Sequence, residues 1–297
     1  MSSVPSRIDV REVGPRDGLQ AEAPIDVATR VALIESLLDA GVTHIEAAAF
    51  VSPKAVPAMA GGAEVLAALP RRPGLVFAAL VPNLKGAELA LAAGVDELTI
   101  TVSASEAYSE RNVRMSVEGS VVAAAGICAL AGSVPVDVIV SCAFGSPYEG
   151  DIAPDEVAVL GRRLIEQGAS RVTYADTTGM ATPRRIDELV DLTGDDVGLH
   201  LHDARGTALV NAYAALLRGV RRFDTAVGGL GGSPFAAGAG GNLGTEDLVH
   251  LLDDLGIETG IDLDRLLGVS REVATIVDHE VPSRLASAGP RSKPAAV

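Results

Sequence analysis

The chain has 297 residues, of which 48% are hydrophobic, and its formal net charge at pH 7 is −15. Such an acidic surface repels phosphate backbones and anionic lipids, which argues against nucleic acid and membranes as partners. No charge-free apolar run reaches the ~18 residues of a transmembrane helix, and the N-terminus lacks the apolar region of a signal peptide. The two cysteines, Cys128 and Cys142, lie in apolar surroundings, which argues against a disulfide framework. We therefore expect a cytoplasmic protein.

Eight short apolar runs, rich in β-branched residues, recur along the chain and have the length of buried parallel strands. They cover residues 8–13, 43–50, 75–81, 97–102, 136–144, 171–178, 197–203 and 222–227. The segments between them have helical periodicity; in the first, Val27, Val31 and Ile34 share one face. This alternation predicts a single (β/α)8 barrel, with a doubly wound open sheet as the alternative. The barrel would span residues 1–285, and residues 286–297, rich in Ala, Ser and Pro, would form a disordered tail.

Ionisable residues occur where several predicted strands end, which is where a (β/α)8 barrel carries its active site. Arg16 and Asp17 follow the first strand, Glu46 lies in the second, and Asp176 lies near the end of the sixth. Arg16 could pair with both Glu46 and Asp176, although the two acids could equally be interior ion-pair partners without a catalytic role.

His200 and His202 form the most informative pair in the sequence. Because side chains alternate along a strand, the two imidazoles share one face of the seventh strand. If that face points inward, the pair predicts a metal site at the barrel mouth; the alternative is two unrelated histidines. Asp17 favours the metal site, since strands one and seven flank strand eight. A set of Asp, two His and an amide oxygen suits Mg²⁺ or Mn²⁺ and tolerates Zn²⁺ or Co²⁺.

Four glycines after the eighth strand, Gly228, Gly229, Gly231 and Gly232, have two interpretations. They could supply backbone geometry that only glycine adopts easily. They could also form a lid that moves over bound substrate, which we favour because four glycines in five residues exceed the needs of a simple turn.

Several sequence blocks resemble the 3-hydroxy-3-methylglutaryl-CoA lyases. The strongest is VGPRDGLQ at residues 13–20. Others are FVSPK at 50–54, PNLKG at 82–86, PYEG at 147–150, GGNL at 240–243 and TEDL at 245–248. The resemblance runs from about Arg7 to Leu267 and is specific to the wider family of metal-dependent barrel lyases and synthases.

The resemblance implies a metal-dependent carbon–carbon lyase acting on an acyl-CoA. Asp17, His200, His202 and Asn242 would match the family's metal ligands. Arg16 would stabilise the enolate of the departing thioester. Glu46 and Asp176 would orient the Arg16 side chain and relay protons, and His200 would also be catalytic. We also assign Gln20, Thr173 and Arg205, with Arg16, to substrate binding. The reaction would release acetyl-CoA and a keto acid. A homodimer is expected from the resemblance alone.

Residue Ser233 departs from the resembling family, whose glycine-rich segment carries a catalytic cysteine at this position. A serine hydroxyl is far less acidic than a thiol and needs a strong neighbouring base. Either Ser233 performs the proton step more slowly, another group performs it, or the reaction differs. Arg205 in place of a tyrosine and Ala49 in place of a serine could also retune the pocket.

Three functions therefore remain open from the sequence. The chain could cleave 3-hydroxy-3-methylglutaryl-CoA or a close analogue. It could instead act on another thioester such as citramalyl-CoA, or work as an aldolase or condensing synthase. It could also be a catalytically silent paralogue that binds only metal and ligand.

Overall fold

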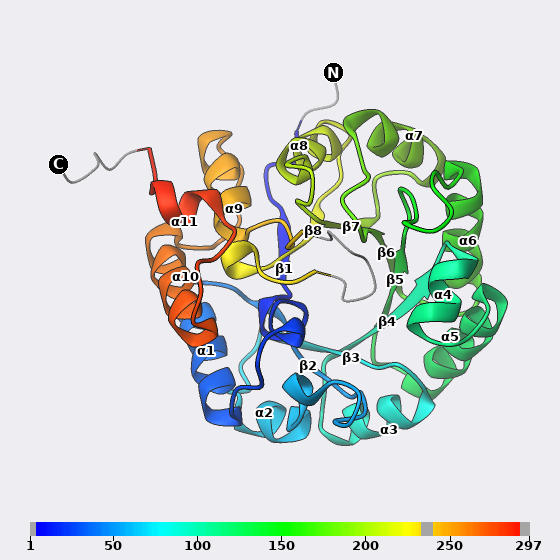
Figure 1. Ribbon diagram of the computed structural model, residues 1–297, viewed down its shortest axis with the longest axis horizontal. Helices are drawn as coiled ribbons and strands as arrows, with labels where there is room; N and C mark the ends of the chain where they lie inside the picture. The colour runs from blue at the N-terminus through cyan, green and yellow to red at the C-terminus, as the bar shows by residue number, and fades with distance from the viewer. Residues whose placement is uncertain (1–3, 233–239, 292–297) are drawn as a thin grey trace.

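The computed structural model describes residues 4–232 and 240–291, and eight parallel strands within it form a closed barrel (Figure 1). In chain order the strands are β1 (Asp9–Glu12), β2 (His44–Ala49), β3 (Val76–Leu80), β4 (Glu97–Ser103), β5 (Val136–Ser141), β6 (Arg171–Asp176), β7 (Gly198–Leu201) and β8 (Arg222–Thr225). Each strand pairs with the next, and β8 pairs with β1. The predicted (β/α)8 barrel is confirmed, and closure excludes the open sheet.

Helices surround the barrel on its outer side (Figure 1). They are α1 (Val27–Asp39), α2 (Gly62–Ala68), α3 (Leu84–Ala92), α4 (Glu106–Asn112), α5 (Val117–Ala131), α6 (Pro154–Glu166), α7 (Pro183–Thr193), α8 (Ala208–Leu217), α9 (Thr245–Asp254), α10 (Leu263–Val277) and α11 (Arg284–Ala288). Side-chain caps fix several starts: Asp26 accepts a hydrogen bond from the Thr29 amide at 2.7 Å, and Asn83 accepts one from Gly86 at 2.9 Å.

Short helical turns follow β1, β2 and β8, at the end of the barrel where the site residues were predicted. They are η1 (Gly14–Gly18), η2 (Leu19–Ala21), η3 (Pro57–Met59) and η4 (Val227–Gly229). In η1, a π-helical turn, the Val13 carbonyl accepts amide hydrogen bonds from Arg16, Asp17 and Gly18 at 3.1, 2.7 and 3.3 Å. This tight turn brings the Arg16–Asp17 pair back over the barrel.

The chain end differs from the prediction. Helix α11 continues through Ala288, three residues into the segment 286–297 that we expected to be a tail. The Asp247 carboxylate accepts the Leu285 amide at 2.8 Å, which ties α11 to α9. Residues 292–297 lie outside the described part of the chain. Among the described residues, no single helix is long and apolar enough to cross a membrane, although the bent pair α4–α5 passes that test when taken together.

Candidate active site

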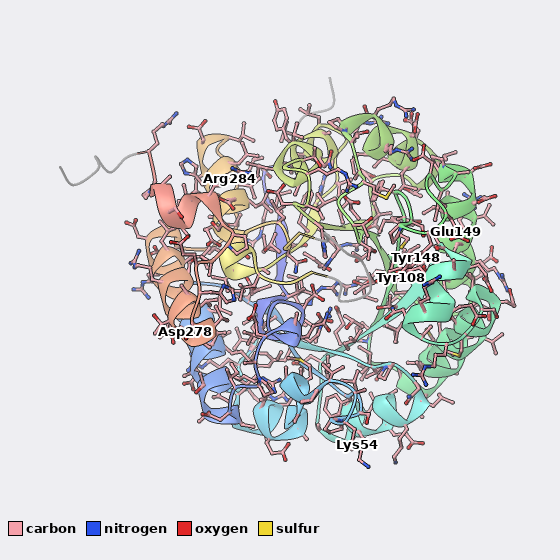
Figure 2. The ribbon with its side chains drawn as sticks, viewed as in Figure 1. Lys54, Tyr108, Tyr148, Glu149, Asp278 and Arg284 are labelled. Carbon is pink, nitrogen blue, oxygen red and sulfur yellow. The ribbon has the colours of Figure 1, made fainter. Side chains whose placement is uncertain are left out.

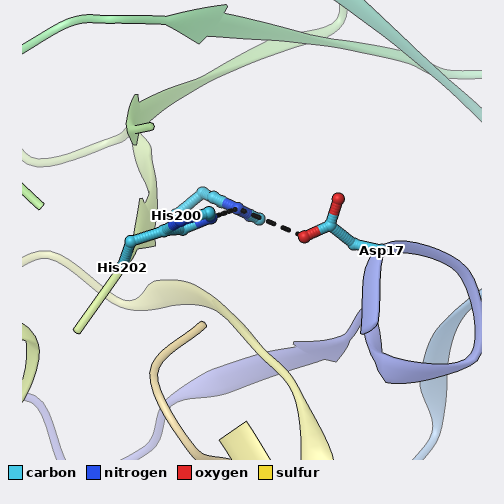
Figure 3. A group of neighbouring side chains, drawn as sticks. All are labelled: Asp17, His200 and His202. Carbon is cyan, nitrogen blue, oxygen red and sulfur yellow. Dashed lines mark hydrogen bonds and ion pairs between the residues drawn. The ribbon is translucent and has the colours of Figure 1, made fainter. Parts of the chain in front are cut away.

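Asp17, His200 and His202 meet at the barrel mouth (Figure 3). Asp17 projects from η1, whereas His200 lies on β7 and His202 directly after it. One oxygen of Asp17 and one nitrogen of each imidazole all lie within 4.8 Å of one another, close enough to ligate a single metal ion. The exposed fractions of the three residues are 7%, 6% and 4%. The two imidazoles share one face, as their two-residue spacing predicts, and that face points into the barrel mouth.

Asp224 holds His200 in one tautomer, from the side of the ring away from the cation site. Its Nδ1 lies 3.1 Å from Oδ2 of Asp224, a carboxylate whose pKa is lowered, despite burial, by Arg11 and by His200 itself. An ionised Asp224 places the proton on Nδ1, so the Nε2 lone pair faces the site. Burial lowers the pKa of His200, but Asp224 and Asp17 outweigh burial and raise it.

His202 presents its own Nε2 only 3.0 Å from Nε2 of His200. Burial first, and then the neighbouring His200, lower the pKa of His202 to about 4, so this imidazole is neutral at pH 7. Two imidazole nitrogens directed at one point fit a shared cation, because metal-ligating histidines are neutral and donate a lone pair.

Asp17 completes the charge of the cluster. Burial opposes its ionisation, but Arg16 and the two histidines lower its pKa to about 2. Its Oδ1 accepts hydrogen bonds from Arg16 at 2.7 Å and Gln20 at 3.0 Å, while Oδ2 accepts one from Asn242 at 2.7 Å. The carboxylate is therefore ionised and fixed in place.

Asn242 lies beside this carboxylate and is 2% exposed. Its Nδ2 donates to Asp17 and to the carbonyl of Leu230, the latter at 2.9 Å. Its Oδ1 is buried and has no hydrogen-bond partner among the described residues. A buried acceptor without a partner is costly, and a cation would satisfy it. Asp17, His200, His202 and Asn242 thus offer the mixed nitrogen and oxygen donors that a divalent cation takes.

Arg16 and Glu46 form a second buried pair at the mouth. Oε2 of Glu46 lies 2.5 Å from both Nε and Nη2 of Arg16, and its Oε1 accepts the Thr99 hydroxyl. Burial lowers the pKa of Arg16, but Glu46 and Asp17 outweigh it and raise the pKa, so the guanidinium stays charged. Glu46 therefore holds the Arg16 side chain in one orientation, and a catalytic role for Glu46 stays a prediction.

A cavity of about 770 Å³ opens over these side chains. Arg16, Asp17, Gln20, His200 and His202 all line it. The cation ligands, the arginine and a large part-apolar space therefore meet in one enclosure, which is the arrangement expected of a small-molecule site. Gln20 has a contact that the sequence did not predict, because its amide also holds Asp17.

Asp176 does not meet Arg16. Its neighbours Ala175 and Thr177 line the cavity, whereas Asp176, on the alternate face, does not. Its Oδ1 accepts the Met180 amide at 2.6 Å, and burial raises its pKa to about 6. The suggested pairing of Asp176 with Arg16 is therefore wrong in this structure: the carboxylate braces the turn after β6.

Thr173 and Arg205 do not line the mouth cavity, contrary to their predicted substrate contacts. Thr173 lies lower in the barrel, where its hydroxyl donates to Asp137 at 2.8 Å. Arg205 is exposed, and its Nη1 donates to the carbonyls of Thr178 and Gly179 at 2.6 and 3.0 Å. Strand position alone did not reveal how deep Thr173 sits, nor that backbone carbonyls would take up the arginine.

The glycine-rich segment is packed at its start. Both carboxylate oxygens of Glu246 accept the Gly228 amide, each at 3.1 Å, and φ is +73° at Gly228 and +69° at Gly229. At Gly231, an added Cβ would lie 2.4 Å from Nδ2 of Asn242. Backbone geometry and close approach therefore explain Gly228, Gly229 and Gly231, and the lid stays a prediction. Gly232 lines the cavity. Ser233 lies outside the described residues.

Two functional positions were missed in the sequence. Asp224 orients His200, and Glu12 accepts the amides of Gly14 and Val227 at 2.7 and 2.9 Å, which joins the turns after β1 and β8. Glu12 and Asp224 each lie within an apolar run of strand length, and an acid in such a run indicates a buried charge with a specific partner.

Comparison with known proteins identifies the family. The HMGL-like family matches residues 7–273. The chain belongs to this family. A lyase from Pseudomonas aeruginosa, named 3-hydroxy-3-isohexenylglutaryl-CoA/hydroxy-methylglutaryl-CoA lyase, is 42% identical and covers 96% of this chain and 98% of its own. The hydroxymethylglutaryl-CoA lyase of Pseudomonas mevalonii is 43% identical over 90% of this chain and 91% of its own.

A solved structure supports the same assignment. The HMG-CoA lyase from Acinetobacter baumannii, in complex with coenzyme A and 3-methylmalate, superposes with a TM-score of 0.94 at 39% identity, covering 100% of both chains. The predicted resemblance is confirmed, and so is the assignment to carbon–carbon lyases of this type.

Proposed function

We propose that this protein cleaves 3-hydroxy-3-methylglutaryl-CoA to acetyl-CoA and acetoacetate, with a divalent cation bound by Asp17, His200, His202 and Asn242. The observation that carries the proposal is the meeting of Asp17, His200 and His202 with the buried, charged Arg16 at one cavity. Asn242 lies beside Asp17, and its buried Oδ1 has no hydrogen-bond partner among the described residues. Family membership supports the same reaction. We favour Mg²⁺ or Mn²⁺ because half of the donors are hard oxygens; Zn²⁺ and Co²⁺ are the alternatives.

The reaction breaks the bond between C2 and C3 of the acyl group. The C3 hydroxyl loses its proton and becomes the keto group, and the bonding electrons pass to the thioester as an enolate, which takes up a proton to give acetyl-CoA. A bound cation supplies Lewis acidity at the substrate oxygens and so lowers the pKa of the hydroxyl.

Arg16 is placed to stabilise the enolate. Glu46 and Asp17 hold it at 2.5 and 2.7 Å, so its charge is oriented before substrate arrives. A fixed charge in a buried site stabilises developing negative charge more than a mobile one in water does.

His200 would hold the cation through Nε2 in this proposal, because its ring lines the cavity and Asp224 holds its Nδ1. A part for His200 in proton movement stays a prediction. Asp176 acts as a positioning residue for the turn after β6. The role of Ser233 stays a prediction, as do the cytoplasmic location and the homodimer.

Turnover with and without metal tests the function. Enzyme stripped by a chelator should release no acetyl-CoA from 3-hydroxy-3-methylglutaryl-CoA, and Mg²⁺ or Mn²⁺ should restore release. Arg16→Gln should lower kcat by about 10²–10³-fold, as loss of one oriented charge donor does. Arg205→Gln, at an exposed position outside the cavity lining, is the matched control. No product under saturating metal, or equal kcat in both variants, would contradict the proposal.

A further inference from the structure

The β5 side of the mouth cavity carries a hydroxyl that neither the cation cluster nor Arg16 uses. Ser141 ends β5, lines the cavity and is 5% exposed. Its Oγ is buried and has no hydrogen-bond partner within residues 4–232 and 240–291. Among the described residues that line this cavity, no other residue outside the cation cluster has a buried side-chain atom without such a partner. Because an unpaired buried hydroxyl is costly, Ser141 is suited to meet a polar group of a bound ligand.

The backbone around Ser141 fixes where this hydroxyl lies. The Ser141 carbonyl accepts the Ala104 amide at 2.9 Å, and the next residue, Cys142, donates its amide to Oγ1 of Thr177 at 2.8 Å. Cys142 has a φ of +57°, which residues other than glycine seldom adopt. Such conformations persist where the surrounding structure holds them, and they gather at ligand sites. The chain therefore leaves the direction of β5 directly after Ser141, whose side chain stays in the cavity wall.

Strand register places Ser141 in the same layer of the barrel as the cation ligand His200. By the register of β5 with β6, Ser141 lies level with Ala175, and Ala175 pairs with His200 on β7. Neighbouring strands lie about 4.8 Å apart, so two strand spacings separate the backbones of Ser141 and His200 by roughly 10 Å. Ala175, between them, is small and lines the cavity. The space between the hydroxyl and the cation site therefore has room for one acyl group.

Ser141 also lies across the mouth from Arg16. In a closed barrel of eight strands, β5 is four strands from β1, the strand that Arg16 follows. Tyr108 and Tyr148, whose ring centres are 6.3 Å apart, gather with Glu149 on the β5 side of the barrel (Figure 2). Tyr108 lines the cavity and is 3% exposed, so this side is screened from water. A hydrogen bond to a charged group is stronger in such surroundings than in water.

The acyl group of the proposed substrate carries three oxygen-bearing groups. In the proposed function the thioester carbonyl faces Arg16 and the C3 hydroxyl faces the cation. The third group is the carboxylate, at the end of the acyl chain away from coenzyme A. We propose that Ser141 is a specificity-determining residue whose hydroxyl donates a hydrogen bond to this carboxylate. The inference rests on the proposed function, since that function decides which groups face Arg16 and the cation.

Replacement of Ser141 by alanine tests this role. Ser141→Ala should raise KM for 3-hydroxy-3-methylglutaryl-CoA about 10–100-fold, because a hydrogen bond to a charged group is lost. Its kcat should stay within about threefold of wild type, since the carboxylate is bound alike before and during bond cleavage. 3-Hydroxy-3-methylbutyryl-CoA is the same thioester without the carboxylate. Its inhibition constant should differ less than about threefold between Ser141→Ala and wild type.

Two further variants separate this role from a structural one. Ser103 pairs with Ser141 across β4 and β5, but it does not line the cavity, and its Oγ accepts the Ser105 amide at 3.0 Å. Ser103→Ala should therefore match wild type in both constants. Ser141→Thr keeps a hydroxyl and should recover most of the affinity lost in Ser141→Ala. An unchanged KM in Ser141→Ala, or a KM and an inhibition constant that rise together, would overturn the assignment and leave the proposed function intact.

If wild type does not cleave 3-hydroxy-3-methylglutaryl-CoA, the proposed function fails, and calorimetric binding in the presence of Mn²⁺ decides on Ser141. Tighter binding of this thioester than of 3-hydroxy-3-methylbutyryl-CoA, with the difference lost in Ser141→Ala, would sustain the carboxylate contact. No difference in wild type, or a difference that persists in Ser141→Ala, would overturn it.

Discussion

The barrel interior holds two charged clusters that differ in how their charges are balanced. At the lower end, the Arg11 guanidinium contacts three carboxylates, Glu97 at 3.0 Å, Asp137 at 2.7 Å and Asp224 at 2.8 Å. At the mouth, Asp17 and Asn242 lie beside two imidazoles whose Nε2 atoms converge to 3.0 Å from one another.

This difference indicates that the lower cluster stabilises the fold, whereas the mouth cluster is suited to bind a ligand. The lower cluster pairs its carboxylates with arginines, since Arg171 also contacts Glu97 at 3.2 Å, and such pairing is what allows charges to stay buried. The mouth cluster keeps ligand atoms open, including Oδ1 of Asn242, which has no hydrogen-bond partner within residues 4–232 and 240–291. Asp224 belongs to both clusters, since it binds Arg11 on one side and His200 on the other.

The largest expected effect concerns Glu12, a buried acid outside both clusters whose hydrogen-bond partners are a hydroxyl and two backbone amides. Burial raises the pKa of Glu12 to about 7, although the Thr245 hydroxyl and the amides of Val227 and Gly14 donate hydrogen bonds to its carboxylate and so lower the pKa in part. Because this pKa exceeds that of an unfolded glutamate, Glu12 favours folding below about pH 4.5, and that contribution is lost as pH rises through 7. Glu12→Gln should remove this dependence, roughly 3 kcal/mol between pH 5 and 8.

Chemical denaturation of wild type and Glu12→Gln at pH 5, 6.5 and 8 measures this dependence. The difference in unfolding free energy between the two proteins should shift with pH in favour of the variant at pH 8. A difference that stays constant across the range would show that Glu12 is ionised in the folded protein throughout.

Asp224 sharpens the comparison because it links the clusters. Asp224→Asn can present an N–H to Nδ1 of His200, which moves the imidazole proton to Nε2 and removes a metal-facing lone pair. We expect metal affinity to fall about 10–100-fold, the usual cost of losing such an orienting partner. Asp137→Asn also removes one carboxylate from Arg11 but does not touch His200, so its affinity should stay near wild type. Equal losses in both variants would show that only the charge of the lower cluster matters.

A smaller effect is expected at Gly231, which lies against the mouth cluster. A Cβ there would crowd Nδ2 of Asn242 at 2.4 Å and Oδ2 of Asp17 at 3.2 Å. Gly231→Ala should weaken metal binding about tenfold, through ligand displacement worth about 1.4 kcal/mol. Gly260 has a similar positive φ of +80°, but an added Cβ there would have no atom within 4 Å. Gly260→Ala is therefore the control that introduces backbone strain without a close contact. Matching metal affinities in the two variants would contradict the close-approach argument.

The sequence predicts the fold and the cation ligands well because both depend on regular spacing. Strand-length apolar runs define the barrel, and the two-residue separation of His200 and His202 places both rings on one face. Asp17 was predicted from its place at the end of the first strand and Asn242 from a family block, and the structure places both beside the histidines.

Other contacts depend on depth and turn geometry, which no periodic pattern encodes. Asp176 and Thr173 lie on the correct strand, but one faces away from the cavity and the other lies too low.

The central claim is that Asp17, His200, His202 and Asn242 form one functional cation site, and Mn²⁺ titration followed by electron paramagnetic resonance tests it most directly. The account predicts one tight Mn²⁺ per chain in wild type, loss of that site in His202→Ala, and loss of acetyl-CoA release in the same variant. His250→Ala, a histidine outside the cluster, should match wild type. Unchanged Mn²⁺ stoichiometry and affinity in His202→Ala would contradict the account.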